Sequence, residues 1–113
     1  MNGWKVVYYL SPNDDNPVKD FLDDRPFVKV KAFRILSHII EYGLNVAIPH
    51  IKKLTGTSLW EIRILGQDNV RILYATKADK KILLLHAFEK KTDKTPSREI
   101  RTALERLANT TNA

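Results

Sequence analysis

Residues 83–100 read LLLHAFEKKTDKTPSREI, and this stretch decides the fold. Its apolar beginning predicts a strand over 82–88 that is apolar at nearly every position, as in a strand covered on both faces. Pro96 then opens a predicted amphipathic helix over 96–109, with Thr95 as its cap. Between them lie the lysines Lys90, Lys91 and Lys94. A buried strand therefore brings a cluster of lysines to one edge of a sheet.

One strand and two helices are predicted before residue 44. Alternating apolar residues indicate a first strand over 4–10. Asn16 precedes Pro17 as a cap precedes the first residue of a helix, and Pro26 opens a longer helix that ends at Gly43. The apolar residues of that longer helix recur at helical spacing, and they are Phe27, Val30, Phe33, Leu36, Ile39 and Ile40.

Two further strands are predicted over 59–65 and 70–76, joined by a hairpin turn at 66–69. Residues 44–54 are expected to be irregular, because a proline within them blocks a continued helix. We therefore expect one α+β domain over 1–113, with a small, mainly antiparallel four-stranded sheet, two N-terminal helices and one C-terminal helix. The helices should pack on one face of the sheet and leave the other at least partly open to a ligand.

Composition limits the class of protein. The chain has 113 residues, 43% of them hydrophobic, which is enough for the core of one domain. It has no cysteine, which excludes disulfides and thiolate metal sites. We find neither a signal peptide nor the apolar run of about 20 residues that a membrane span needs, so we expect a cytoplasmic protein without membrane contact.

The net charge of +6 is distributed unevenly. Residues 1–50 hold equal numbers of basic and acidic side chains, so the whole excess lies in residues 51–113. That asymmetry favours a polyanionic partner for a surface built from the second half. A solvated basic surface that only aids solubility is the alternative.

Strand periodicity places three charged side chains on one face. Glu61 and Arg63 share a face of the strand over 59–65, and Arg71 takes the corresponding face of its neighbour. A carboxylate among cations suits cleavage of a ribose phosphodiester, because the glutamate can take the 2′-OH proton while the cations stabilise the phosphorane. The same residues could instead form a cross-strand ion pair on a solvated face, worth at most about 1 kcal/mol.

Other candidate residues have two interpretations each. His86 is either a general acid, since histidine titrates near neutrality, or a core residue in an apolar strand. Trp60 and Tyr74 could stack on a base, but their apolar register favours the core. The lysine cluster either contacts phosphate or forms a solvated loop before a helix. His38, within the second predicted helix, is interpreted as structural, and His50 is a loop histidine for which the sequence indicates no partner. No group has metal-ligand spacing, so we expect no metal and no cofactor.

The order of the motifs resembles that of the RelE/ParE toxin superfamily, and in particular its phage-derived HigB-like branch. LWEIR at 59–63 and VRILY at 70–74 precede the stretch at 83–100 and a C-terminal helix. The resemblance covers nearly the whole chain and is strongest over 51–107. Its most specific part is HAFEKKT at 86–92, together with the Thr-Pro and Glu-Ile pairs that follow.

This resemblance implies a RelE-like fold and the toxin of a type II toxin–antitoxin pair. RelE- and HigB-like members of the superfamily are ribosome-dependent, metal-free endoribonucleases that cut mRNA in the A site and leave a 2′,3′-cyclic or 3′-phosphate. Glu61 and Arg63 match the proton-transfer positions of the second strand, and Arg71 matches the arginine of the third. The expected catalytic residues are Glu61, Arg63, Arg71 and Lys91. The expected RNA phosphate contacts are Lys53, Lys90 and Lys94.

The sequence also departs from RelE itself. RelE has basic residues where Glu61 stands, and a tyrosine near its C-terminus that stacks on the substrate base, whereas no tyrosine follows Tyr74 here. The general acid stays open among Lys90, Lys91 and His86. The scaffold also hosts ParE-like inhibitors of DNA gyrase that are not nucleases, and a non-catalytic antitoxin-binding module is a third interpretation. The implied partners are a cognate helix-turn-helix antitoxin, HigA-like, and mRNA on the ribosome.

Overall fold

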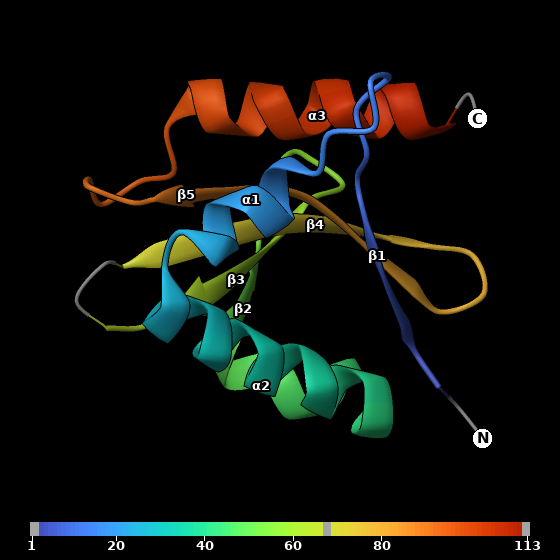
Figure 1. Cartoon of the computed structure of the whole chain (residues 1–113), viewed down its shortest axis with the longest axis vertical. Helices are drawn as coiled ribbons and strands as arrows, with labels where there is room; N and C mark the ends of the chain where they lie inside the picture. Colours follow the sequence, from blue (N-terminus) through green and yellow to red (C-terminus); the bar gives the residue numbers. More distant parts are fainter. Residues whose placement is uncertain (1–2, 67–68, 112–113) are drawn as a thin grey trace.

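Helices lie on both faces of a mixed sheet, as Figure 1 shows. The computed structural model describes residues 3–66 and 69–111, and it is to these that the following description applies. The elements in chain order are β1 (Lys5–Tyr8), α1 (Pro17–Asp23), α2 (Pro26–Tyr42), the 3-10 helix η1 (Leu44–His50), β2 (Ile51–Lys53), β3 (Trp60–Ile64), β4 (Val70–Lys77), β5 (Lys81–Glu89) and α3 (Ser97–Thr111). No helix among them is long and apolar enough to cross a bilayer.

The order of strands across the sheet is β1-β5-β4-β3-β2. The pairs β2–β3, β3–β4 and β4–β5 are antiparallel, whereas β1 runs parallel to β5, with Val6 opposite Ile82. A parallel neighbour cannot be reached through a tight turn, so the chain joins β1 to the rest of the sheet through long intervening elements. The last strand in sequence is therefore an interior strand.

Two apolar clusters share the sheet. The first lies between the sheet and the pair α1 and α2, and its fully buried members include Val18, Leu22, Ile39, Ile62, Ile72, Ile82 and Leu84. The second lies on the opposite face beneath α3, and it includes Leu73, Leu83, Leu85, Phe88 and Ala103. From Ile82 to Leu85 the residues of β5 alternate between the clusters, because side chains of a strand point to opposite faces in turn. A register shift at Leu85 then interrupts the alternation, so that Leu85 and His86 both lie on the α3 side. The apolar residues of β5 are thus divided between the two clusters.

The helix signals of the sequence are confirmed, with one exception. The Asn16 side chain accepts a hydrogen bond from the backbone N–H of Lys19 at 3.1 Å, and Gly43 ends α2 with a positive φ of 90°. The sequence predicts Thr95 as the cap of α3, but this prediction is wrong, because the Thr95 hydroxyl donates a hydrogen bond to Glu61 instead. The first turn of α3 is closed instead by the carbonyl of Pro96, which accepts from the backbone N–H of Glu99.

The expected four-stranded sheet is wrong in its number of strands, because the described chain has a five-stranded sheet. The expected mainly antiparallel pairing is confirmed, with the edge pair β1–β5 as the parallel exception. The additional strand β2 falls in the segment expected to be irregular, and it has only three residues, of which two are exposed lysines. Periodicity needs a longer run than that to reveal a strand. The predicted hairpin turn is described only at Gly66 and Asn69, since 67 and 68 lie outside the described residues.

The expectation of helices on a single face is also wrong, because α3 covers part of the face opposite α1 and α2. The apolar register of α2 differs too. Its core side is formed by Val28, Ala32, Leu36 and Ile39. Four of the large apolar residues predicted by spacing face outward, and they are Phe27, Val30, Phe33 and Ile40. Apolar residues occur on both sides of α2, so spacing alone could not assign its buried side.

Two adjacent isoleucines of α2 provide a test of this register. Ile39 is 0% exposed and Ile40 is 42% exposed, while both make the same change in helix propensity when replaced by alanine. We expect Ile39→Ala to lower the free energy of unfolding by about 2–5 kcal/mol through loss of burial and a residual cavity. Ile40→Ala should lower it by less than about 1 kcal/mol. Urea unfolding of both variants measures the difference, and equal losses would contradict the register.

Candidate functional site

A buried ion pair lies on the α3 side of the sheet. Arg71 Nε approaches Glu61 Oε1 at 3.3 Å, and the two side chains are only 8% and 1% exposed. The residues reach each other diagonally, because the register pairs Glu61 with Leu73 and Arg71 with Arg63. Strand periodicity thus predicted the shared face correctly. The alternative, a cross-strand ion pair of Glu61 with a neighbouring arginine, is confirmed for Arg71, but the expectation that this pair is solvated is wrong.

The pair is covered by the loop 90–96, called here the lysine loop. Thr95 donates a hydrogen bond from its hydroxyl to Glu61 Oε2 at 2.5 Å, which fixes the C-terminal end of the loop. At the other end, the backbone N–H of Lys90 donates to the carbonyl of Asn69 at 3.0 Å. The Asn69 side chain donates in turn to the carbonyl of Lys90 at 3.1 Å. Both ends of the lysine loop are therefore tied to the strands that carry the ion pair.

Asn69 also orients the arginine. Its side-chain oxygen accepts from Arg71 Nη1 at 2.7 Å, and the same nitrogen lies 3.3 Å from the carbonyl of Val70. Asn69 has a φ of 49°, in the left-handed region that asparagine tolerates better than most residues. One asparagine thus joins the turn before β4, the guanidinium of Arg71 and the start of the lysine loop.

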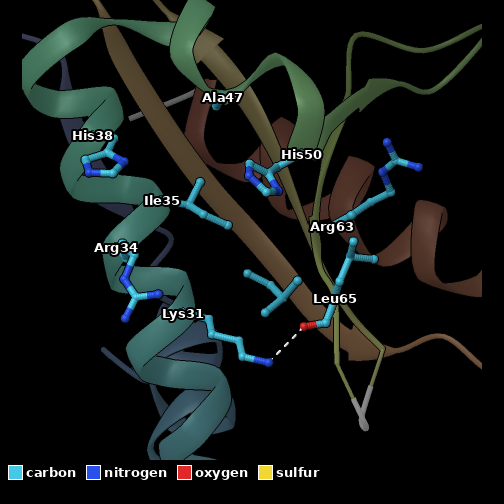
Figure 2. A pocket seen from close by; sticks show the side chains of 9 residues that line it. Lys31, Arg34, Ile35, His38, Ala47, His50, Arg63 and Leu65 are labelled. Carbon is cyan, nitrogen blue, oxygen red and sulfur yellow. Dashed lines mark hydrogen bonds between the residues drawn. The ribbon is translucent and has the colours of Figure 1, made fainter.

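The remaining predicted catalytic residues lie around this pair at different places. Arg63 is half-buried and stands directly opposite Arg71 on β3. Figure 2 shows its guanidinium on the far side of β3 from Lys31 and Arg34. Lys91 is exposed and lines a separate hollow with Arg25, Glu89 and Arg98.

The predicted phosphate contacts do not form one group. Lys90 and Lys94 belong to the lysine loop, Lys90 half-buried and Lys94 exposed. Lys53 lies on the edge strand β2 opposite Trp60, and its ammonium is 5.8 Å from the centre of that ring. It also donates to the carbonyl of Thr57. Trp60 packs against the cluster beneath α1 and α2, so Lys53 is directed away from the face of Glu61.

His86 belongs to a polar network that attaches α3 to β5. Its Nε2 lies 2.6 Å from Glu99 Oε1, and its Nδ1 lies 3.2 Å from Arg106 Nη1. Arginine can only donate, so Nδ1 accepts and the proton of the neutral ring is on Nε2, directed at Glu99. Arg106 also donates to the carbonyl of Leu85 at 2.8 Å. Burial lowers the pKa of His86 below its ordinary value, although the hydrogen bond to Glu99 opposes that shift.

The aromatic candidates are core residues, as their register indicated. Tyr74 is 1% exposed in the cluster beneath α1 and α2, and burial raises its pKa to about 12. Trp60 is half-buried against the same cluster. Neither ring is presented to a ligand on the face of the ion pair.

Sequence reasoning missed Thr95 and Asn69. Thr95 is 34 positions from Glu61, so no local pattern connects them, and its place before Pro96 resembles that of a helix cap. Asn69 had a local signal as a turn residue, but its contacts with Arg71 and Lys90 depend on the pairing of β4 with β5. Among the described residues, no three His, Asp or Glu side chains gather as a metal ion would require.

A family of known proteins matches most of the chain, including this arrangement. The model of the family described as Phage derived protein Gp49-like matches residues 19–108. The matched segment contains the ion pair, Asn69 and the whole lysine loop. Comparison with curated proteins finds no significant match.

The burial of the ion pair implies a large effect of its residues on the free energy of unfolding. Arg71→Met should lower the free energy of unfolding by about 3–5 kcal/mol, because it leaves the Glu61 carboxylate buried without its cation. The double variant Glu61→Gln with Arg71→Met removes both charges and should recover most of that loss. Urea unfolding of the single and double variants measures the coupling. A single-variant loss below about 1 kcal/mol, as for an exposed pair, would contradict the burial.

The polar network of His86 implies that the folding stability of the protein depends on pH. The folded-state pKa lies below the ordinary value of 6.5, so between those two values the unfolded chain binds more protons than the folded one. Stability is therefore complete above 6.5 and falls as the pH decreases through that interval. We expect His86→Gln to lose less stability than wild type between about pH 7.5 and about pH 5.5. The exposed His38→Gln is the control, and an identical pH dependence in both variants would refute the assignment.

Proposed function

This chain belongs to the Phage derived protein Gp49-like family, a family of toxin-like proteins, and on that premise we propose that it is the toxin of a type II toxin–antitoxin pair. In this proposal it is a HigB-like member of the RelE/ParE superfamily that cleaves mRNA on the ribosome. The observation that carries the proposal is the buried Glu61–Arg71 pair beneath a loop with three lysines.

A buried ion pair contributes little net free energy to the stability of a sheet. Removing two charges from water costs several kcal/mol per ion, and apolar residues of similar volume are often as stable or more so. Leu73 pairs with Glu61 and Phe88 pairs with Arg71, and both apolar neighbours belong to the cluster beneath α3. The other two register neighbours are cationic, Lys52 beside Glu61 and Arg63 beside Arg71. A carboxylate and a guanidinium kept in contact and out of water therefore support the proposal of a chemical role.

In the proposed reaction, Glu61 Oε2 takes the proton of a ribose 2′-OH. The 2′-oxygen attacks the adjacent phosphorus, the bond to the 5′-oxygen breaks, and the leaving 5′-oxygen receives a proton from a general acid. The products are a 2′,3′-cyclic phosphate and a 5′-OH end. Arg71, with Arg63 opposite, stabilises the charge that develops on the phosphorane oxygens.

Lys91 and Lys90 are the better candidates for the acid. Both ring nitrogens of His86 are already engaged, by Glu99 and by Arg106, so the ring has no free proton to give to a leaving group. The lysines are carried by a loop that must move if RNA is to reach the ion pair.

In the structure the loop is held against the ion pair by Thr95. Glu61 is 1% exposed, and the hydroxyl of Thr95 occupies the position of a hydrogen-bond donor to Oε2. A ribose 2′-OH is a donor of the same kind, so substrate binding would exchange one O–H···O⁻ hydrogen bond for another. Displacement of the lysine loop therefore need not leave the carboxylate without a donor.

Two partners complete the proposal. A basic surface that contacts phosphate does not select sequence, so a second body, the ribosome, is needed to position the mRNA. A helix-turn-helix antitoxin would neutralise the toxin by covering the basic face or by displacing α3.

Glu61→Asp tests the proposed base without removing the buried charge. Shortening the side chain by one methylene moves the carboxylate by about 1 Å, which should reduce cleavage about 100-fold. Glu105→Asp, an exposed acid on α3, is the matched control and should retain full activity. Mapping of mRNA 5′ ends after controlled expression gives the readout, and far-UV circular dichroism confirms that both variants fold.

Undiminished cleavage by Glu61→Asp would contradict the role of this residue. Intact mRNA together with accumulated gyrase–DNA cleavage complexes, on expression of wild type, would contradict the nuclease and support a ParE-like inhibitor. Harmless expression of wild type without its antitoxin would contradict both.

A further inference from the structure

A hollow of about 290 Å³ lies between α2 and the end of β3, away from the ion pair (Figure 2). Lys31, Arg34 and His38 line it from α2, and His50 lines it from the end of η1. Its apolar wall includes Ile35 and Ile64. No Asp or Glu is among the described residues that line the hollow.

The sheet topology creates this hollow. β2 begins at Ile51, opposite Ile62, so the part of β3 beyond Ile62 has no strand beside it on that edge. The chain instead crosses there as η1, which delivers His50. Lys31, Arg34 and His38 are three and four residues apart, so they share one side of α2. Lys31 donates to the carbonyl of Leu65 at 3.0 Å, which holds its ammonium at one end of the hollow.

A second hollow, of about 300 Å³, adjoins the first and shares Lys31, Ile64 and Leu65 with it. Phe27 lines this second hollow, and it is 88% exposed. Proteins bind single-stranded nucleic acids with exposed aromatic rings beside cations, because the bases stack on the rings while the phosphates contact the cations. Asn69, which orients Arg71, also lines the second hollow.

We propose that these two hollows form a contact for single-stranded RNA, with a phosphate at Lys31 and Arg34 and a base stacked on Phe27. The inference rests on the proposed function, because the strand would continue past Asn69 toward the ion pair. Arg63 lies between the two places, since it lines the first hollow and pairs in register with Arg71. The contact would hold a nucleotide that flanks the one being cut.

The observations favour a single strand over other anions. Free phosphate would make no use of the exposed Phe27 ring. Double-stranded RNA keeps its bases paired and stacked, so it could not offer one to Phe27. Two adjoining hollows, one basic and one with an aromatic ring, fit one nucleotide with its phosphate.

Fluorescence anisotropy with a short, 2′-O-methylated RNA measures this contact without cleavage. Arg34→Gln and Phe27→Ala should each weaken binding at least about fivefold. The matched controls are Arg101→Gln on α3 and Tyr42→Ala at the end of α2, which are exposed and line neither hollow, and they should bind as wild type does. Arg34→Gln should also reduce the slope of log affinity against log salt by about 0.7, whereas Phe27→Ala should leave it unchanged.

The contact is refuted if Arg34→Gln binds as tightly as Arg101→Gln, if Phe27→Ala matches Tyr42→Ala, or if wild type does not bind. Equal affinity for a duplex of the same sequence, or competition by inorganic phosphate alone at equal strength, would also refute it. Binding that depends on Arg34 and Phe27 in a chain that cuts no mRNA would overturn the proposed function and leave the RNA contact standing.

Discussion

The burial of β5 on both faces is the constraint on which the rest of the structure depends. The strand lies between β1 and β4, and its apolar side chains are divided between the cluster beneath α1 and α2 and the cluster beneath α3. An apolar strand of this kind is stable only if both faces are covered, which requires helices on both sides of the sheet. The position of α3, and of the loop that leads into it, follows from that requirement.

The lysine loop consequently lies beside the end of β3 and the start of β4, where it covers the Glu61–Arg71 pair. At one end of the loop, Asn69 binds both the carbonyl of Lys90 and the guanidinium of Arg71. At the other end, Thr95 donates a hydrogen bond to Glu61. Fold and site are therefore coupled through a few polar contacts rather than through a large apolar interface. Such contacts can be exchanged for equivalent ones with a ligand, which is why a buried carboxylate is compatible with a proposed catalytic role.

Local patterns in the sequence predicted much of this arrangement. Strand alternation assigned Glu61, Arg63 and Arg71 to one face, and proline with its preceding cap located the start of α1. Patterns failed where tertiary contacts decide. β2 is too short to show a period, the buried side of α2 is ambiguous because apolar residues surround the helix, and the Thr95–Glu61 hydrogen bond joins residues 34 positions apart. The residue types and their spacing predicted which residues share the site. The burial of these residues beneath the lysine loop depends on tertiary packing, which the sequence pattern does not show.

The central claim is that Glu61 acts on a ribose 2′-hydroxyl, and a change in the substrate tests it most directly. Ribosomes programmed with an mRNA that carries one 2′-deoxynucleotide at the mapped cleavage position would be incubated with the purified protein, beside the all-ribose mRNA. We expect cleavage of the all-ribose message with a 2′,3′-cyclic phosphate end and no cleavage at the deoxy position. Cleavage at the deoxy position at an undiminished rate would contradict this claim.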